Sequence, residues 1–456
     1  MKALILLSSL GVITLLAEIF SFKKVLYPVV LLGIASIFIL NAIDWNTNVL
    51  YFNMMRFDNY AVAFTGVILL IAFLWFLMAQ DFFKEETNKT DHYALVIFAL
   101  AGAVIMSSYT NMAMLFLGIE ILSIPMYILA GSRKEDALSN EAAFKYLIMG
   151  AFATGFLLFG IVLIYGATGS FDLGEIAVFI ANNASAIPSI FYIGILLMLV
   201  GLSFKVSAVP FHFWAPDVYQ GAPTVITAFM STVVKTAAFA AFLRLFSTSF
   251  YASASSWHGI VWVMAALTLL VGNITAVLQT SVKRMLAYSS VAHAGYMLLG
   301  LLAGNSFSDS AILTYAAVYS IASIGTFCII SIIDHARGSD NIDGFNGLGK
   351  SNPFLAIVMT IALLSLAGIP PTAGFFAKYY IFTSALEAGN VGLVFIAIIA
   401  SLVGVYYYFR IIIAMYFKEG AKEKIQIEAN HSVLLVLVAI ATIVLGLFPD
   451  CLISLL

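Results

Sequence analysis

Long apolar runs, separated by short polar loops, occupy almost the whole chain. The runs are about 18 to 25 residues long, the length that a helix needs to cross a hydrocarbon layer. Fourteen spans are predicted, at residues 3–20, 25–43, 60–82, 92–108, 112–130, 141–168, 189–209, 223–246, 257–279, 284–302, 309–334, 353–387, 391–417 and 432–455. The pattern therefore predicts an all-α, polytopic membrane protein without a separate soluble domain.

Two of the predicted spans are interrupted by prolines. The seventh runs into "KVSAVPFHFWAPDVYQGAPT", residues 205–224, and the twelfth contains "AGIPPTAG", residues 367–374. Proline removes a backbone donor and clashes with the preceding turn, so a continuous helix is not expected at either place. Irregular backbone at membrane depth is tolerated only where protein or water satisfies it. We therefore expect both breaks to lie at a hydrated, functional part of the molecule.

The charges of the loops predict an orientation. Loops after even-numbered spans hold only Arg56, whereas loops after odd-numbered spans hold thirteen basic residues. Because basic loops favour the cytoplasm, the odd-numbered loops are predicted to be cytoplasmic and both termini periplasmic. The thirteen are Lys23, Lys24, Lys84, Lys89, Arg133, Lys134, Lys283, Arg284, Arg337, Lys350, Lys418, Lys422 and Lys424.

An internal repeat is also indicated. "MYILAG" in the fifth span is similar to "GYMLLG" in the tenth, and each lies two spans before a broken helix. Spans 4–8 and 9–13 are therefore predicted to form two five-helix units, of which the second is inverted. The predicted divisions are 1–91 for the first three spans, 92–246 for the first unit, 257–417 for the second, and 418–456 for the last loop and span.

Composition supports the membrane prediction and excludes several other classes. The chain is 62% hydrophobic and 10% charged, with a mean hydropathy of +1.05, far from the values of soluble domains. A net charge of −2 gives no indication of a nucleic-acid partner. Cys328 and Cys451 lie in apolar runs without CxxC spacing, so both are expected to be buried structural residues. No nucleotide-binding or metal-binding motif is found, so no redox centre, cofactor or metal site is predicted in this chain.

Four ionisable residues lie inside predicted spans, away from any loop: Glu120, Lys205, Lys235 and Lys378. Each such charge costs about 2.5–3.5 kcal/mol when it is unpaired at the centre of a membrane. Structural ion pairs between helices are one explanation, but a single acid cannot neutralise three lysines. We favour a proton relay, because a buried lysine can bind and release a proton and a nearby carboxylate changes its proton affinity.

The proline breaks support the relay interpretation. Lys205 lies five residues before Pro210, and Lys378 lies seven residues after Pro371. Each lysine is thus within two turns of a break, where half-helix ends favour charge and water can enter.

Three further residues are candidates for the relay. His212 lies in the first break, with a capping or packing role as the alternative. His293 lies mid-span, and a satisfied polar core residue is the alternative. Lys145 opens the sixth span and could instead extend its ammonium group to the membrane surface. Arg244 and Arg410 are expected to do the same, and Asp217 is expected to anchor a loop.

Several stretches together resemble a known family. They are "KVSAVPFHFWAPDVYQGAPTVITAFMSTVVKTAAFAAFLR", "LGIEILSIPMYILAG", "NEAAFKYLIMGAF" and "GIPPTAGFFAKYYIF". They resemble the antiporter-like subunits of proton-pumping NADH–quinone oxidoreductase, respiratory complex I, of the N type, over about residues 57–448. Mrp-type antiporter subunits share the arrangement of lysines and prolines but not the sequence motif "PFHFWAPDVYQGAPT". The M type carries a glutamate at the position of Lys378, so Lys378 argues against that type. The L type has a long C-terminal lateral helix, and this chain stops near Leu456 with no room for one.

The resemblance implies a fold, a function and a set of site residues. The fold would have fourteen helices with two inverted five-helix units, and the family's proton-channel residues fall on Glu120, Lys205, Lys235 and Lys378. The chain would be a non-redox, proton-translocating subunit of a translocase in the bacterial cytoplasmic membrane. Flavin, iron–sulfur clusters and quinone would lie in partner subunits, and the partners would be other antiporter-like and small helical membrane-arm subunits. The alternatives are an Mrp-type cation/proton antiporter subunit and a structural subunit without transport.

Overall fold

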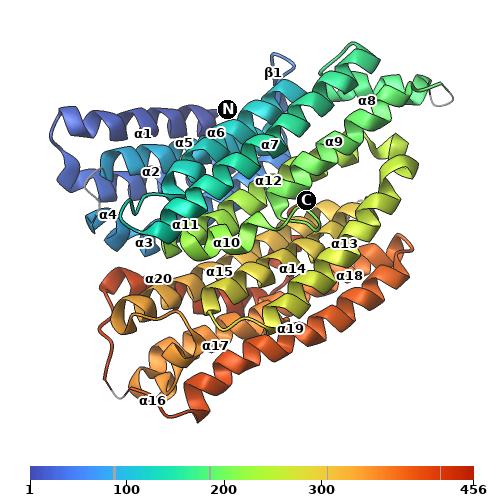
Figure 1. The fold of residues 1–456 in the computed structure, drawn as a ribbon. Coiled ribbons are helices and arrows are strands. Elements are labelled where there is room, and N and C mark those ends of the chain that lie inside the picture. Colours follow the sequence, from blue (N-terminus) through green and yellow to red (C-terminus); the bar gives the residue numbers. More distant parts are fainter. Residues whose placement is uncertain (86–88, 184–185, 306, 422) are drawn as a thin grey trace.

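The computed structural model describes residues 1–85, 89–183, 186–305, 307–421 and 423–456, so Lys422 lies outside the described residues. Long helices run side by side through the whole molecule (Figure 1). Among the described residues, thirteen helices are long and apolar enough to cross a membrane. Helices suit this environment because each satisfies its own backbone hydrogen bonds. The predicted all-α membrane class is confirmed.

The first half of the chain begins with two helices and a small hairpin. In chain order the elements are α1 (Lys2–Ile19), η1 (Lys23–Val25), α2 (Leu26–Ile43), β1 (Val49–Tyr51), β2 (Met55–Phe57), α3 (Asn59–Met78), α4 (Gln80–Glu85), α5 (Lys89–Ser108), α6 (Met112–Ala130), α7 (Ala137–Thr168), α8 (Leu173–Asn182), α9 (Ser189–Val206), α10 (Trp214–Gly221), α11 (Thr224–Phe229), η2 (Met230–Val234) and α12 (Lys235–Thr248). The strands β1 and β2 pair antiparallel, with Leu50 opposite Arg56.

The second half has the same character. Its elements are η3 (Tyr251–Ser253), α13 (Ala254–Val277), α14 (Val282–Ala303), α15 (Ser308–Arg337), η4 (Ile342–Phe345), α16 (Leu348–Ser351), α17 (Pro353–Ala367), α18 (Ala373–Glu387), α19 (Val391–Phe417), α20 (Ala429–Leu447) and α21 (Asp450–Ile453).

Both predicted interruptions are present. Helix α9 ends at Val206, where Ser207 takes a left-handed conformation with φ 59°, and the chain then forms the short helix α10. Helix α17 ends at Ala367, where Gly368 has φ 81°, and α18 follows after a short turn. The helices α17 and α18 have 15 residues each, so each covers only about 22 Å. The predicted twelfth span is therefore present as two half-helices and is not one of the thirteen long ones.

The two halves of the chain lie side by side. In Figure 1 the blue and green helices occupy one half and the yellow to red helices the other, while α15 packs against α3 of the first half. Helices α7 and α9 pack closely at Gly160. A Cβ atom added there would lie only 2.8 Å from the carbonyl oxygen of Gly194, so the absence of a side chain allows this contact. The α11–α12 segment, α14 and α15 are almost wholly buried, whereas α1, α2, α7 and α20 are largely exposed. The buried helices form the centre of the molecule.

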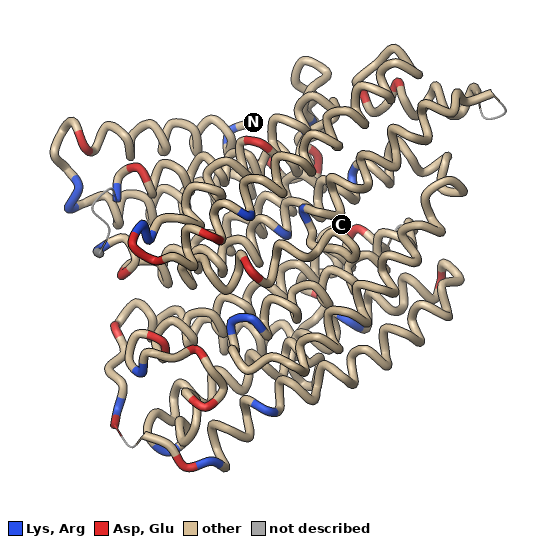
Figure 2. Tube along the Cα trace, viewed as in Figure 1, with Lys and Arg blue, Asp and Glu red and all other residues tan. Residues whose placement is uncertain are grey.

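Charged residues lie mainly at helix ends and in loops (Figure 2). Most helix centres are free of them, as the hydrophobic pattern predicts. The few that lie inside the bundle are therefore the residues whose burial must be explained.

Two expectations need correction. The last span was expected to run to residue 455, but α20 ends at Leu447 because Pro449 lacks the N–H group needed to continue the helix. Cys451 consequently lies in the short helix α21 and is exposed, so its predicted burial is wrong. Cys328 on α15 is buried as expected.

Candidate functional site

The ionisable residues predicted inside the spans come from four different helices. Glu120 lies on α6, Lys205 on α9, Lys235 on α12 and Lys378 on α18. The three lysines expose between 2% and 7% of their surface, and Glu120 is half-buried. Buried ammonium groups are costly unless hydrogen-bond acceptors surround them. The acceptors of each lysine therefore decide what it can do.

Lys235 has a full set of acceptors. Its Nζ lies 2.6 Å from the carbonyl oxygen of Ser290, 2.5 Å from the hydroxyl of Ser290 and 3.3 Å from the hydroxyl of Ser207. An ammonium group has three N–H donors, so all three can be used here. Ser207 is the residue at which α9 ends. Lys235 is thus bonded directly to the first helix break.

A local irregularity helps to orient Lys235. The π-helical turn η2 ends at Val234, immediately before Lys235. A π turn inserts one residue relative to an α-helix, which rotates the following side chains by about 100° around the axis. Such turns occur frequently at functional sites. The sequence alone gave no indication of this turn.

Lys205 has fewer partners. Its Nζ donates to the Ser123 hydroxyl on α6 at 2.5 Å and lies 5.8 Å from the ring centre of Tyr146. Glu120 precedes Ser123 by three residues, about one turn of α6. Its Oε1 is buried without a hydrogen-bond partner among the described residues, and no ion pair joins it to Lys205 there. The structure thus places an unpaired carboxylate one turn from the residue that holds Lys205.

Lys378 binds the end of the second break. Its Nζ donates to the carbonyl oxygen of Ala367 and to the hydroxyl of Ser401, both at 2.8 Å, and lies 4.9 Å from the ring centre of Tyr296. Ala367 is the last residue of α17, so its carbonyl has no partner within that helix. Lys378 supplies the missing donor across the break.

His293 lies between Lys235 and Lys378. It follows Ser290 by one turn of α14, and its Nδ1 lies 2.7 Å from the hydroxyl of Tyr315. Its Nε2 lies 3.2 Å from the hydroxyl of Tyr408. A cavity of about 10 Å³, large enough for about one water molecule, adjoins both His293 and Lys378. This cavity is lined by His293, Tyr315, Val318, Tyr319, Ser365, Leu366, Gly374, Ala377 and Lys378.

The other two relay candidates lie apart from this row. His212 is buried in the first break, where its ring lies tilted against that of Phe213 with centroids 4.5 Å apart, and its Nδ1 has no partner among the described residues. Lys145 forms ion pairs with Glu141 and Asp217, each at 2.7 Å, and 37% of its side chain is exposed. The structure therefore groups Lys145 with surface charges and leaves His212 without a bond to any of the three lysines.

Asp217 joins three helices. From α10 it accepts bonds from Lys145 of α7 at 2.7 Å and from Arg284 of α14 at 2.9 Å. Partial burial raises the pKa of Asp217, but the bonds from Lys145 and Arg284 outweigh this and hold its pKa below the usual value. The anchoring role expected for Asp217 agrees with these contacts.

Two basic residues, Arg244 and Lys283, differ from expectation. Arg244 does not extend to the surface: it is 6% exposed, pairs with Asp58 at 2.7 Å and lies 4.6 Å from the ring centre of Tyr60. Arg410 donates to two carbonyl oxygens at the end of α13. One belongs to Val277, the last residue of that helix, and the other to Gln279, two residues later. Lys283, expected in a loop, is buried in the first turn of α14 and donates to the carbonyl of Ala222. In each case an unpaired backbone or carboxylate oxygen nearby provides a partner that the sequence does not reveal.

The partners of the candidate residues that sequence reasoning missed are neutral. Ser123, Ser207, Ser290 and Ser401 hold the lysines, and Tyr315 and Tyr408 hold His293. Serine and tyrosine are common in such helices, so only their contacts distinguish these members.

Comparison with known proteins agrees with this architecture. A family model described as "NADH:quinone oxidoreductase/Mrp antiporter, TM" matches residues 109–404. NADH-quinone oxidoreductase subunit N of Cytophaga hutchinsonii is 46% identical over 461 residues, covering 100% of this chain and 99% of the relative.

Solved structures share the fold. A chain of respiratory complex I from Thermus thermophilus is 32% identical, with a TM-score of 0.84, over 99% of this chain and 98% of that one. A chain of the Mrp complex from Dietzia sp. DQ12-45-1b has a TM-score of 0.87 over 100% and 96% of the two chains, but at 20% identity it shows the fold alone. The chain belongs to the NADH:quinone oxidoreductase/Mrp antiporter family and, within it, to the NADH-quinone oxidoreductase subunit N group.

Proposed function

We propose that this chain translocates protons in the membrane arm of an NADH–quinone oxidoreductase, and that Glu120, Lys205, Lys235 and Lys378 carry them. The observation that carries the proposal is the row of buried polar groups from α6 to α18, which are Glu120, Lys205, Lys235, His293 and Lys378. Each lysine in the row is held by hydroxyl or carbonyl oxygens, and two of the three are bonded to the end of a broken helix. These are groups that pass protons.

The first step changes the electrostatic interaction between Glu120 and Lys205. Lys205 has a single hydrogen bond, and Glu120 Oε1 has none among the described residues. Moving a carboxylate from about 10 Å to about 4 Å from an ammonium changes their interaction by about 2.5 kcal/mol at an effective dielectric constant of about 20. That corresponds to nearly two orders of magnitude in proton binding. A small movement of α6 against α9 is therefore enough to load or unload Lys205.

The later steps follow the order of the groups along the row, from Lys205 through Lys235 and His293 to Lys378. Ser207 lies two residues after Lys205 and is bonded to Lys235, which is bonded in turn to Ser290. One turn further along α14, His293 adjoins the small cavity that it shares with Lys378. In this proposal Lys378 exchanges its proton at the second break, between α17 and α18, with the periplasmic side.

Redox chemistry would take place in other subunits. The groups that line the row are amines, hydroxyls, an imidazole and a carboxylate, which exchange protons. Flavin, iron–sulfur clusters and quinone would be held by partner subunits, and the relatives named subunit N support a place among membrane-arm subunits. The complex would convert electron transfer into movement of the Glu120 region.

The orientation and the division into units are part of the proposal. The excess of basic loops after odd-numbered spans supports a cytoplasmic position for those loops and periplasmic termini in the bacterial inner membrane. Broken helices at α9 and at α17–α18 support two inverted five-helix units at 92–246 and 257–417.

The test uses sealed inverted membrane vesicles that carry Lys205→Ala, with assembly of the complex checked on a native gel. Donor oxidation and proton uptake are followed together, and Lys24→Ala, at an exposed residue in η1, is the matched control. We expect the assembled Lys205→Ala complex to lose at least about 90% of both activities and the control to keep them. Wild-type pumping by Lys205→Ala would refute the relay.

A further inference from the structure

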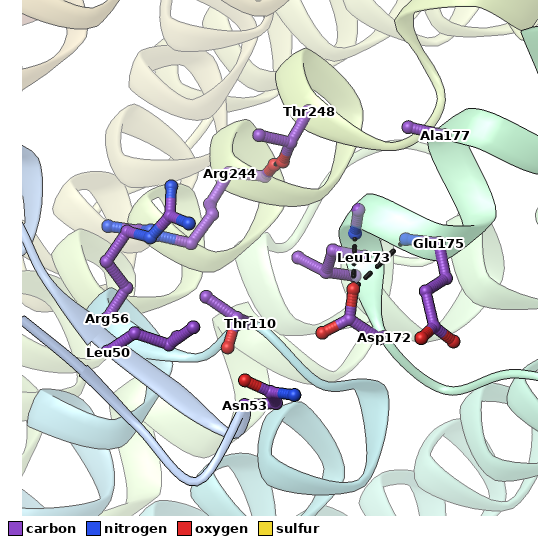
Figure 3. Close-up of a pocket in the computed structure, with 11 residues that line it drawn as sticks. Leu50, Asn53, Arg56, Thr110, Asp172, Leu173, Glu175, Ala177, Arg244 and Thr248 are labelled. Atoms are coloured by element: carbon purple, nitrogen blue, oxygen red, sulfur yellow. Dashed lines mark hydrogen bonds between the residues drawn. The ribbon is translucent and has the colours of Figure 1, made fainter.

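A pocket of about 390 Å³, lined by none of the row residues Glu120, Lys205, Lys235 and Lys378, lies on the face of the molecule that carries the β1–β2 hairpin. The hairpin, the segment just before α6, the beginning of α8 and the end of α12 line it. Its size is that of a small-molecule site. The lining residues used below are Arg56, Thr110, Asp172, Glu175 and Arg244 (Figure 3).

One end of the pocket is basic. Figure 3 shows Arg56 and Arg244 at the same end. Arg56 has no hydrogen bond or ion pair among the described residues, and it is the basic residue that stood alone in the loops after even-numbered spans. Arg244 is 6% exposed and pairs with Asp58 through its terminal nitrogens, but its Nε is buried without a partner in the described part of the chain. Two guanidinium groups that line one pocket repel each other unless an anion lies between them.

A neutral group completes this end. The hydroxyl of Thr110 lines the same pocket and is buried without a hydrogen-bond partner among the described residues. Buried polar atoms without partners are uncommon in folded proteins and call for a ligand or water. Arg56, Arg244 Nε and Thr110 together match the oxygens of a phosphate group, which accepts several charge-assisted hydrogen bonds.

The opposite end is acidic. Asp172 caps α8 by accepting bonds from the backbone N–H groups of Gly174 and Glu175 through Oδ1, at 2.8 and 3.0 Å. Glu175 accepts a bond from the hydroxyl of Ser170. Figure 3 shows the two carboxylates on the side away from Arg56 and Arg244. The pocket therefore suits a ligand with a negative and a positive group a short distance apart.

The surroundings favour a lipid. Leu50 and Met54 on the hairpin are each 43% exposed, Phe52 at its tip is 88% exposed, and Val178, next to the pocket residue Ala177, is 59% exposed. Apolar side chains beside a charged pocket at the ends of membrane helices are typical of the boundary between hydrocarbon and headgroups. Acyl chains can lie against them while the headgroup enters the pocket.

We propose that this pocket binds the headgroup of a zwitterionic phospholipid that carries a primary amine, a phosphoethanolamine. The phosphate lies between Arg56, Arg244 and Thr110, and the ammonium group lies against Asp172 and Glu175. A trimethylated amine cannot donate hydrogen bonds to these carboxylates, and a glycerol headgroup brings no positive charge to them. The pocket therefore selects phosphatidylethanolamine over phosphatidylcholine and phosphatidylglycerol.

The test uses the intact complex in phosphatidylcholine nanodiscs, to which phosphatidylethanolamine, phosphatidylglycerol or inorganic phosphate is added separately. Native mass spectrometry measures lipid retained on the subunit, and thermal unfolding measures stabilisation. We expect phosphatidylethanolamine to be retained about tenfold more strongly than either other lipid, and Arg56→Gln to remove most of this retention. Arg133→Gln, an exposed arginine between α6 and α7, is the matched control and is expected to have no effect.

Asp172→Asn tests the acidic end. Asparagine caps a helix about as well as aspartate, so α8 is expected to stay folded while the negative charge is lost. This variant should bind phosphatidylethanolamine and phosphatidylglycerol almost equally. Equal retention of all lipids by the wild type, an effect of Arg133→Gln equal to that of Arg56→Gln, or stabilisation by inorganic phosphate alone would overturn the proposal.

Discussion

At the scale of single residues, the three buried lysines differ in how well their ammonium groups are bonded. Lys235 has three oxygen acceptors, Lys378 has two and an aromatic ring, and Lys205 has one and a more distant ring. An ammonium group has three donors, so Lys205 gains most from a carboxylate that moves closer. This order explains why the proposed control by Glu120 acts on Lys205.

Replacing Lys235 by methionine tests the centre of the row. Methionine keeps the length of the side chain but removes the charge and all three hydrogen bonds, and neutral replacements of buried charges are often tolerated by the fold. We expect the Lys235→Met complex to assemble and its proton uptake in inverted vesicles to fall at least about tenfold. Lys350→Met, at an exposed position in α16, should pump normally. Unchanged uptake by Lys235→Met would mean that protons bypass α12.

Asp217 provides a test that depends on pH. Because its pKa is lower in the folded than in the unfolded protein, its stabilising effect is present above the unfolded pKa and is lost as pH falls through the folded pKa. Asp217→Asn should lower the unfolding temperature by about 1–2 °C at pH 7, allowing for solvent screening, and by less near pH 3.

The control for Asp217→Asn is Asp343→Asn. The Asp343 side chain is 81% exposed and lies 3.5 Å from Lys418, so little change is expected at any pH. A difference between wild type and Asp217→Asn that stays constant from pH 7 to pH 3 would show that the effect comes from packing and not from charge.

At the scale of elements, both broken helices end in the same way. Each ends at a residue in the left-handed conformation, Ser207 after α9 and Gly368 after α17, and a lysine from another helix binds at or next to that end. The exposed carbonyl and hydroxyl groups of a helix end favour a cation. The break thus positions the lysine, and the lysine stabilises the break.

Substitution of Gly368 tests this coupling. An alanine Cβ there would lie 2.7 Å from Cδ of Lys378, which must move and so withdraw Nζ from the Ala367 carbonyl. Alanine at φ 81° also costs about 1–2 kcal/mol. We expect Gly368→Ala to reduce proton uptake about tenfold while the complex still assembles.

The matched control is Gly169→Ala. Gly169 ends α7 with φ 77°, and an added Cβ meets nothing within 4 Å. It carries the same backbone cost without a clash, so proton uptake should stay near the wild-type rate. If both variants lose the same activity, backbone strain and not the position of Lys378 is responsible.

The elements themselves could be predicted from the sequence, because apolar runs of membrane length leave few alternatives. The fifth, seventh and thirteenth spans begin at their predicted residues, 112, 189 and 391. The π-helical turn before Lys235 could not be predicted, because residues 230–234, MSTVV, include no proline or glycine that would mark an irregular turn. Tertiary packing decides such a turn.

At the scale of the whole molecule, the two halves of the chain meet where α3, α10 and α11 of the first half pack against α14 and α15 of the second. The α11–α12 segment, α14 and α15 are nearly fully buried between them. Helices that are buried all round transmit small displacements, because close-packed interiors have little free volume. In the proposed relay, a movement at Glu120 would reach Lys378 through these helices.

Thiol labelling tests the proposed orientation. Cys328 is fully buried and Cys451 is exposed after α20, in the part of the chain that is proposed to lie on the periplasmic side. A membrane-impermeant maleimide should label the protein in right-side-out vesicles but not in sealed inverted ones, and Cys451→Ser should abolish the labelling. Labelling only in inverted vesicles would place the C-terminus in the cytoplasm.

The sequence by itself determined the class of the protein, the positions of most of its helices and of both breaks, and the burial of Lys205, Lys235 and Lys378. These follow from local properties: the length of apolar runs, proline chemistry and the cost of charge in a membrane. Only the tertiary structure decided which oxygens each lysine binds, that Arg244 and Lys283 are buried, and that Arg56 and Arg244 share a pocket. Those facts depend on residues far apart in the chain, which local patterns do not relate to one another.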